Sequence, residues 1–501
     1  MRYLPNGKQM SEADAHTIHE IGIPSLVLME RAALQIVETM HKKNISTEKN
    51  LIVCGSGNNG GDGFAVARLL TEQGKHADVL FAGKEASLSE ECRCQKQIVE
   101  NMGISVFTEF PDEEYTVIID AVFGVGLCRE ITGHYKDVID WMNLQDAEKV
   151  AVDIPSGICA ATGKILGTAF RADLTVCMAC VKLGCELFPG KSYAGESIPV
   201  AIGIDPKYLD VCYTFDKNDL GKLLPSRMMN SHKGSYGKVL MITGSPGMAG
   251  AAFLSACAAY TVGAGLVQIY TASENRLALQ ELLPEAIISC YDSYDDSQLS
   301  HLLDWADVVC IGCGLGMGQI SEKILKNVLK NVSCPCVIDA DGLNLLSRNI
   351  ELLNQCCAPV ILTPHMKEMS RLTGWSIDTI MEDRFQALDQ IIKQSGPDTK
   401  SSIICVLKDS RTVVAQTNRQ KFVNLAGNNS MAKGGSGDVL AGTIAGLLAQ
   451  HMAPFEATTV GVFLHACGGD EAKKSKGSYS VLARDLIQGM ADAMKNAKEC
   501  R

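Results

Sequence analysis

Aromatic residues and an excess of positive charge are both scarce in this chain of 501 residues. Phe, Trp and Tyr make up 6% of the chain, and 57 acidic residues outnumber 46 basic ones, which gives a net charge of −11. A protein that binds nucleic acid needs a basic surface for the phosphates, and one that binds single strands also uses aromatic side chains on which bases stack. We therefore expect no nucleic-acid partner.

The N-terminal residues 1–10 contain no apolar run of the kind that a secretory signal has. Twenty cysteines are present, but many lie inside apolar runs such as 51–54 and 308–313, and none has the spacing of a zinc ribbon. In a long chain this pattern favours buried free thiols over a disulfide framework. We expect a soluble, cytoplasmic protein.

A stretch of 35 residues, 239–273, contains no Asp, Glu, Lys or Arg. It is longer than the roughly 20 residues that cross a bilayer. However, it is rich in Gly, Ala and Ser, and Gly244, Pro246 and Gly247 would interrupt a spanning helix. We predict a buried strand, a loop, a helix of small residues and a second strand, and hence no membrane association.

Short apolar runs alternate with helical stretches along the whole chain, which predicts an α/β fold with parallel sheets covered by helices. The alternation pauses after residue 206, so we place a domain boundary near 213, between domains 1–213 and 214–501. The strands expected in the first domain are 51–54, 78–81, 117–120, 150–153, 174–177 and 197–200, with a helix at 63–73. In the second domain we expect strands at 238–243, 266–270, 308–311, 336–339, 360–362 and 403–407, and helices at 250–262, 343–346, 367–372 and 439–450.

A glycine-rich loop, 55–63, follows the first of these strands and opens a helix. Gly55, Gly57 and Gly60 match the Rossmann pattern G-x-G-x-x-G, in which backbone N–H groups approach a pyrophosphate. A tight structural turn is the alternative. An NAD dehydrogenase would have an acid at the end of the next strand, but the first acid there is Glu85, after a Gly-Lys pair. The oxygens of Asn58, Asn59 and Asp62 could instead ligate a cation.

Two acidic residues, Asp120 and Asp153, stand at the carboxyl ends of predicted strands. Ligands bind outside these ends in open parallel sheets, so the pair predicts a site. Each acid could alternatively cap the N-terminus of a helix.

The loop 57–63, the segment 120–127, the segment 153–157 and the upstream segment 22–33 together resemble the NAD(P)HX epimerase domain. The resemblance covers about residues 9–205 and implies inversion at C6 of a hydrated nicotinamide ring. Asp153 is then the acid/base candidate and a substrate contact, and Asn59, Asp120 and Ser156 would ligate a potassium ion. The dinucleotide would contact Asn58, Asn59, Gly60, Gly61, Asp62, Gly124, Val125, Gly126, Leu127, Cys128, Arg129 and Glu130.

In the second half, a Gly-Gly-Ser-Gly sequence at 434–437 precedes Asp438 and an apolar helix. Such a helix N-terminus offers donors to a transferring phosphoryl group, and Asp438 could accept a hydroxyl proton or simply cap the helix. Lys408 follows a buried strand and could meet phosphate or lie on the surface. His365, with Glu368 three residues on, could be a ligand or a core histidine.

These features, with the segments 232–237, 244–252 and 362–368, resemble the ADP-dependent NAD(P)HX dehydratase domain, which has a ribokinase-like fold. The resemblance covers about residues 222–495. It implies that Asp438 is the catalytic base, which activates the ring hydroxyl toward ADP, and that magnesium, held in part by Glu368, supports the transfer. The hydrated dinucleotide would contact Ala251, Gly316, His365 and Asp438, and the adenine nucleotide would contact Lys408, Asp409, Ser410, Arg411, Thr412 and Gly437.

Two loops depart from the dehydratase pattern: Cys313 replaces a usual proline, and Gly342 replaces a usual alanine. Both changes keep small loops and remove no proposed catalytic group. The sequence thus predicts a bifunctional isomerase and lyase that acts on NADHX and NADPHX with ADP as co-substrate, releasing AMP and phosphate. The fold is compatible with a homo-oligomer. The alternatives are a ribokinase-type small-molecule kinase with an accessory domain, and a non-enzymatic dinucleotide sensor or scaffold.

Overall fold

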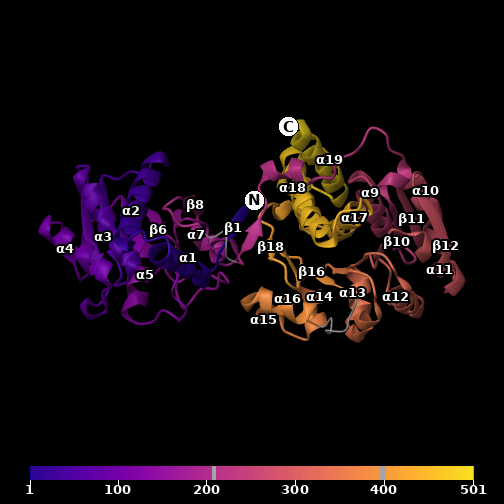
Figure 1. The fold of residues 1–501 in the computed structure, drawn as a ribbon, viewed down its shortest axis with the longest axis horizontal. Coiled ribbons are helices and arrows are strands. Elements are labelled where there is room, and N and C mark those ends of the chain that lie inside the picture. Colours follow the sequence, from indigo (N-terminus) through magenta and orange to yellow (C-terminus); the bar gives the residue numbers. More distant parts are fainter. Residues whose placement is uncertain (206–209, 394–401, 500–501) are drawn as a thin grey trace. The chain divides into compact units, whose positions relative to one another are not determined.

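The computed structural model describes residues 1–205, 210–393 and 402–499, in two compact units. One unit comprises Tyr3–Cys212, and the other comprises Met1–Arg2 and Tyr213–Arg501. Each unit is built on its own parallel or mainly parallel sheet, which confirms the predicted α/β class (Figure 1).

The smaller unit contains a seven-stranded, fully parallel sheet in the order β4-β3-β2-β5-β6-β7-β8. Its strands are β2 (Lys49–Cys54), β3 (His76–Phe81), β4 (Val106–Phe107), β5 (Val117–Ala121), β6 (Glu148–Val152), β7 (Leu174–Met178) and β8 (Glu196–Val200). The chain moves from β2 outward to β4 and then returns to place β5 on the other side of β2. This reversal opens a crevice at the carboxyl ends of β2 and β5, where parallel sheets bind ligands.

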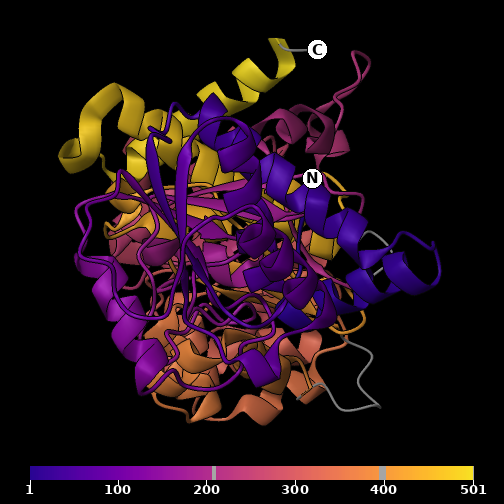
Figure 2. The ribbon, with the colours of Figure 1, turned by 90° about the vertical axis from the view of Figure 1, so that its left-hand side faces the viewer.

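Helices cover both faces of this sheet, and alternate residues of each strand face them. Ile52 and Cys54 pack against α2 (Ser25–Lys42), α3 (Asn58–Glu72) and α4 (Glu90–Asn101). Leu51 and Val53 pack on the opposite face, against α5 (His134–Leu144). The remaining helices are α1 (Gly7–His19), α6 (Leu183–Glu186) and α7 (Lys191–Ala194). Figure 2, which is turned by 90° from Figure 1, shows these indigo and purple helices around the strands of the smaller unit.

The predicted start of the helix at residue 63 is wrong, because α3 begins at Asn58. The residues of the glycine-rich loop therefore form the first turns of the helix. A Cβ at Gly60 would lie 2.0 Å from the carbonyl oxygen of Gly55, so the absence of a side chain lets the helix begin directly above the strand end. Glycine is a poor helix former, which is why the sequence pattern placed the start too late.

The larger unit carries an eleven-stranded sheet in the order β1-β9-β18-β17-β16-β15-β14-β13-β10-β11-β12. The segment from β12 to β16 is parallel, and β16, β17 and β18 pair antiparallel. The strands are β1 (Arg2–Leu4), β9 (Cys212–Thr214), β10 (Lys238–Ile242), β11 (Leu266–Ala272), β12 (Ile287–Tyr291), β13 (Val308–Ile311), β14 (Cys336–Ile338), β15 (Val360–Leu362), β16 (Ile403–Leu407), β17 (Val413–Gln416) and β18 (Phe422–Val423). The sequence did not predict β1, β9, β12, β17 or β18.

One face of this sheet packs against α9 (Ala249–Thr261), α17 (Ser436–Ala449), α18 (Pro454–Ser480) and α19 (Ala483–Glu499). Figure 1 shows α17–α19 in yellow on one side of the strands and α13–α16 in orange on the other. The other helices are α8 (Leu220–Leu223), α10 (Arg276–Leu282), α11 (Asp296–Trp305), α12 (Gln319–Asn331), α13 (Ala340–Leu346), α14 (Met366–Thr373), α15 (Ile377–Glu382) and α16 (Arg384–Ile392).

The stretch without charged residues forms β10, the small-residue helix α9 and β11, in the predicted order. Helix α9 lies so close to α17 that a Cβ at Gly442 would be 1.9 Å from the carbonyl oxygen of Ser255. Over the described ranges, no helix has both the length and the apolar character needed to cross a membrane.

Candidate active sites

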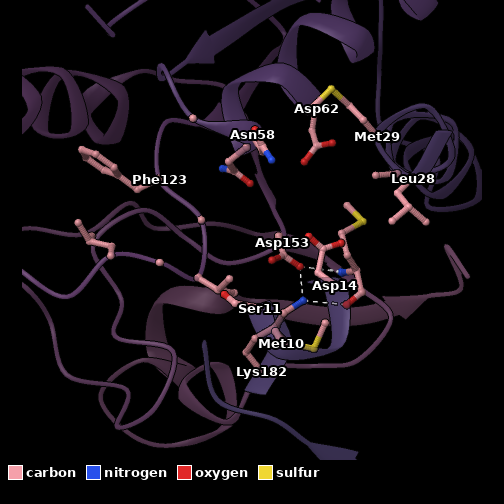
Figure 3. A pocket seen from close by; sticks show the side chains of 18 of the residues that line it. Met10, Ser11, Asp14, Leu28, Met29, Asn58, Asp62, Phe123, Asp153 and Lys182 are labelled. Atoms are coloured by element: carbon pink, nitrogen blue, oxygen red, sulfur yellow. Dashed lines mark hydrogen bonds and ion pairs between the residues drawn. The ribbon is translucent and has the colours of Figure 1, made fainter. Parts of the chain in front are cut away.

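The smaller unit contains a cavity of about 530 Å³ at the crevice between β2 and β5 (Figure 3). The first turn of α3, the loop after β5, the residue after β6 and helices α1 and α2 all contribute to its wall. Ten of the predicted site residues line it: Asn58, Asn59, Asp62, Gly124, Val125, Gly126, Leu127, Cys128, Arg129 and Asp153. The structure thus brings together residues that lie up to 95 positions apart in the sequence.

Three other predicted dinucleotide contacts are not in the lining of this cavity. Gly60 faces the backbone of Gly55, and a Cβ at Gly61 would meet the side chain of Met29. Glu130 lines a neighbouring hollow of about 240 Å³, which shares Arg129 with the main cavity. The two glycines therefore shape the turn of α3 that carries Asn58 and Asp62.

Asp120 and Ser156 form a buried hydrogen-bonded pair beneath the cavity. Ser156 Oγ donates to Asp120 Oδ1 at 2.6 Å, and the Ser156 backbone N–H donates to Oδ2 at 2.7 Å. Asp120 lies within β5, so the helix-cap interpretation of this acid is wrong. Burial raises the pKa of Asp120 to about 6, although the hydrogen bonds from Ser156 and Val122 lower it.

Asp153 follows β6 in a left-handed backbone conformation, with a φ of 70° that few residues other than glycine adopt. It caps no helix either. Its Oδ1 accepts a 2.8 Å hydrogen bond from the backbone N–H of Met178 and forms an ion pair with Lys182 Nζ. The Lys182 side chain is fully buried, and its ammonium also donates to the carbonyl oxygen of Met178 at 2.8 Å. The ammonium group is thus fixed beside the carboxylate.

Sequence reasoning missed both Lys182 and Asp14, which line the same cavity. Lys182 follows the carboxyl end of β7, the position that drew attention to Asp120 and Asp153, so that rule could have found it. Asp14 comes from the middle of α1 and carries no such signal. Burial raises the pKa of Asp14, and the negative charge of Asp153 adds to the rise.

The second site lies in the larger unit, where Asp438 is in the first turn of α17. The helix is capped by Gly435, which is in a left-handed conformation, and no side chain caps it, so the interpretation of Asp438 as a cap is wrong. A carboxylate oxygen of Asp438, Cys313 Sγ and a carboxylate oxygen of Asp339 all lie within 4.8 Å of one another. Burial and then the charge of Asp339 raise the pKa of Asp438 to about 7, against the lowering effects of Cys313 and Lys408.

Lys408 is not a surface residue: its Nζ donates to Asp339 Oδ1 at 2.6 Å, and its side chain is 18% exposed. A Cβ at Gly437 would lie 3.3 Å from this Nζ, so the glycine loop before α17 and Lys408 meet at one point. Glu368 Oε2 is 3.9 Å from Lys408 Nζ, and burial raises the pKa of Glu368 to about 7. Lys408 therefore lies between Glu368 and Asp339, and Asp339 lies beside Asp438.

His365 is half exposed, so it is not a core histidine. Its Nδ1 accepts hydrogen bonds from the backbone of Lys367 and Glu368, and it thereby caps α14. Its Nε2 lies 3.4 Å from Glu368 Oε1, which keeps the ring at the edge of the acidic cluster. Burial and then the charge of Lys408 lower the pKa of His365, which favours the neutral ring.

The other predicted nucleotide contacts shape the loop after β16. Arg384 pairs with Asp409 Oδ2 at 3.1 Å, and Thr412 Oγ1 donates to the backbone of Asp409 at 3.1 Å. Arg411 donates to the carbonyl oxygen of Leu425, while Ser410 lies exposed on the loop.

The predicted contact Ala251 lies in the first turn of α9, and Gly316 lies on the loop between β13 and α12. A Cβ at Gly314 would be 2.9 Å from Ala251 Cβ, and Gly316 donates its N–H to Asp341 Oδ2 at 2.8 Å.

Two family models match the chain, one for each unit. The model described as NAD(P)H-hydrate dehydratase matches residues 239–491, and the model described as YjeF-related protein N-terminus matches residues 25–184. The bifunctional NAD(P)H-hydrate repair enzyme of Moorella thermoacetica is 34% identical over 99% of this chain and 97% of its own length. The chain belongs to the bifunctional NAD(P)H-hydrate repair enzymes.

Other members of this repair-enzyme family agree with that assignment. The bifunctional NAD(P)H-hydrate repair enzyme of Coxiella burnetii is 35% identical over 97% of this chain and 98% of its own length. Among solved structures, the ADP/ATP-dependent NAD(P)H-hydrate dehydratase of Bacillus subtilis, co-crystallised with ATP and Mg²⁺, superposes with a TM-score of 0.51 at 28% identity. It covers 57% of this chain and 99% of that one. A ribokinase-like superfamily protein of Enterococcus faecalis superposes with a TM-score of 0.50 at 31% identity, over 58% of this chain and 97% of that one. The two resemblances inferred from the sequence, and the ribokinase-like fold of the larger unit, are confirmed.

Proposed function

We propose that this repair enzyme catalyses epimerisation in domain 1–213 and dehydration in domain 214–501. The first domain interconverts the R and S forms of NADHX and NADPHX, and the second converts the S form to NAD(P)H with ADP. The observation that carries the proposal is that each unit has its own group of buried acids, at a cavity in one and at a glycine-capped helix in the other.

In the dehydratase site, Asp438 takes the proton of the ring hydroxyl. The hydroxyl oxygen then attacks the terminal phosphoryl group of ADP, and AMP leaves. Elimination breaks the C6–O bond and a C–H bond of the neighbouring carbon C5, so that phosphate departs, the proton passes to water and the reduced nicotinamide forms. Lys408 and the N–H groups at the start of α17 face the phosphoryl group, where they offset its negative charge. Magnesium, which a structural relative was crystallised with, neutralises phosphate charge when bound, and Glu368 would help to hold it.

Asn59, Asp120 and Ser156 would hold a potassium ion in the epimerase domain. A carboxylate, a hydroxyl and the carbonyl oxygen of Phe123, 3.4 Å from Ser156 Oγ, form a set of oxygen ligands suited to a hard cation. Asn59 Nδ2 is buried without a hydrogen-bond partner in the described part of the chain, and the carboxamide oxygen Oδ1 is the atom of Asn59 that would ligate the ion. The ion would fix the loop after β5 at the edge of the cavity.

The test is a reduced-nicotinamide absorbance assay on a mixture of R and S hydrate with Mg²⁺ and K⁺. Complete recovery of NADH that depends on ADP supports both activities, provided that parallel samples without enzyme show slow spontaneous epimerisation. Recovery of the S portion alone contradicts the epimerase assignment. Replacing K⁺ with tetramethylammonium should slow recovery of the R portion only. The cytoplasmic location and a homo-oligomer stay predictions.

A stable phosphorylated product without NADH would instead support the ribokinase-type kinase. The absence of both activities would support the dinucleotide sensor or scaffold.

A further inference from the structure

The cavity of the smaller unit gathers three carboxyl groups and one ammonium group, more ionisable groups than dinucleotide binding requires. Asp62 comes from the first turns of α3, Asp14 from α1, Asp153 from the end of β6, and Lys182 from the segment after β7. Figure 3 shows Asp62 on one side of the cavity, and Asp153 with Lys182 on the other.

The two oxygens of Asp153 have different surroundings. Oδ1 is held by the Met178 N–H and by Lys182 Nζ. In the segments that the structure describes, Oδ2 accepts no hydrogen bond, and the residue lines the cavity. Lys182 is itself held by the Met178 carbonyl, so it neutralises Asp153 from behind and leaves one oxygen available to a ligand. This is the arrangement of a base with a fixed orientation.

Asp62 has the opposite character. Its side chain makes no ion pair with Lys182, and burial, followed by the charges of Asp153 and Asp14, raises its pKa well above the ordinary value. The other groups that it affects are the thiols of Cys54 and Cys92, which are buried and uncharged. These surroundings favour the neutral form of Asp62, against the lowering effect of Lys182, and Asp62 lines the same cavity as Asp153, which is paired with Lys182. Two acids with separated protonation states are the usual requirement for paired acid and base catalysis.

We propose that Asp153 and Asp62 are the base and the acid of the epimerase reaction, and that Lys182 is a positioning residue for Asp153. The inference rests on the proposed function, and it assigns to Asp62 a proton-donor role beyond binding.

The substrate carbon C6 bears a hydroxyl group and is bonded to the ring nitrogen. Asp153 Oδ2 removes the hydroxyl proton, the C6–O bond becomes a carbonyl, and the C6–N bond breaks with its electron pair on nitrogen. Asp62 gives its proton to that nitrogen. After rotation about the adjacent C–C bond, nitrogen attacks the other face of the carbonyl and returns its proton to Asp62, while the oxygen regains the proton from Asp153. Atoms, charges and electrons balance, and no oxidant or reductant takes part.

The experiment measures interconversion of purified R hydrate by chromatography of the two epimers, as a function of pH, in the full-length enzyme. Because the donor is lost when Asp62 ionises, wild-type kcat should fall on the alkaline side of the profile. Asp62→Asn should lower kcat at least 100-fold and abolish this alkaline fall, with less than a threefold change in the Kd of NADH. Asp62→Glu should keep the alkaline fall.

Lys182→Met should lower kcat at least tenfold, and Lys182→Arg, which retains the charge, should recover most of it. Asp137→Asn, an exposed carboxyl-to-amide change on α5, is the matched control and should leave the profile unchanged. Thermal unfolding of each variant, followed by circular dichroism, reports whether the smaller unit is folded, and dehydration of pure S hydrate reports the larger unit.

The outcomes separate the two levels of inference. Wild-type enzyme that dehydrates S hydrate but does not epimerise R hydrate overturns the proposed function. If the wild-type enzyme epimerises R hydrate and the Asp62→Asn variant keeps the wild-type rate and alkaline fall, only the acid role of Asp62 is overturned. Equal losses in Lys182→Met and Lys182→Arg, each with normal dehydration, overturn the positioning role of Lys182.

Discussion

At the residue scale, the raised pKa of Asp438 has a direct kinetic consequence. Its pKa is about 7 because burial and Asp339 disfavour the charged form, and a base acts only when ionised. We therefore predict that dehydratase kcat/KM rises as the pH increases through about 7 and reaches a plateau above it. Initial rates of NADH formation from S hydrate at saturating ADP, measured from pH 5.5 to 9, test this expectation.

Asp438→Asn keeps the size of the side chain but cannot accept the proton. We expect it to lower dehydratase kcat by about 10²–10⁴-fold and to leave epimerisation intact, because the two sites lie in different units. The matched control is Asp304→Asn, an exposed change on α11 in the same unit. Loss of both activities in a folded Asp438→Asn protein would contradict the separation of the sites.

A site residue could be predicted from the sequence where it lies in a short motif together with other site residues. Asn58, Asp62 and Asp438 stand beside glycines in the first turns of helices, so local sequence identifies them. Lys182 and Asp14 come from isolated positions, and only the tertiary structure brings them to Asp153. The pairing of Lys408 with Asp339 likewise spans 69 residues, which is why sequence left Lys408 as either a surface or a phosphate-binding residue.

At the element scale, the contact between α9 and α17 depends on the absence of a side chain at position 442. We predict that Gly442→Ala destabilises the larger unit, because the added Cβ would collide with backbone at Ser255 rather than with a movable side chain. Overpacking costs about 1–3 kcal/mol, and the better helix propensity of alanine offsets only up to about 1 kcal/mol.

Thermal or urea unfolding of both variants measures the difference, with Gly250→Ala on α9 as the matched control. A Cβ at Gly250 meets nothing within 4 Å, so this variant should be neutral or slightly more stable. A stabilising effect of Gly442→Ala would show that the helices can move apart freely.

The strands that sequence located are parallel and mostly buried, and their continuous apolar runs need no partner to be recognised. The strands that it missed, such as β18 and β9, have two or three residues and exist through pairing with distant segments. The start of α3 was missed because four glycines among residues 57–63 conceal a helix that tertiary packing stabilises.

At the scale of the whole molecule, the chain has two sets of hydrophobic cores that share no residues. We predict that heat inactivates the two activities at different rates. Because a ligand stabilises only the unit that binds it, ADP with Mg²⁺ at about 100 times its Kd should add about 2.7 kcal/mol to the dehydratase unit alone. Residual epimerase and dehydratase activities, assayed after timed heating with and without ADP, test this; equal protection of both activities would contradict independent unfolding.

The uncharged stretch of β10, α9 and β11 also bears on how the protein is made. β10 lies between β11 and β13 in the sheet, but β13 begins at Val308, 66 residues after β10 ends at Ile242. Until β13 leaves the ribosome, an apolar strand without nearby charges has one open edge, and such segments aggregate readily. Production of the enzyme in cells should therefore depend on chaperones that shield this segment until β13 pairs with β10.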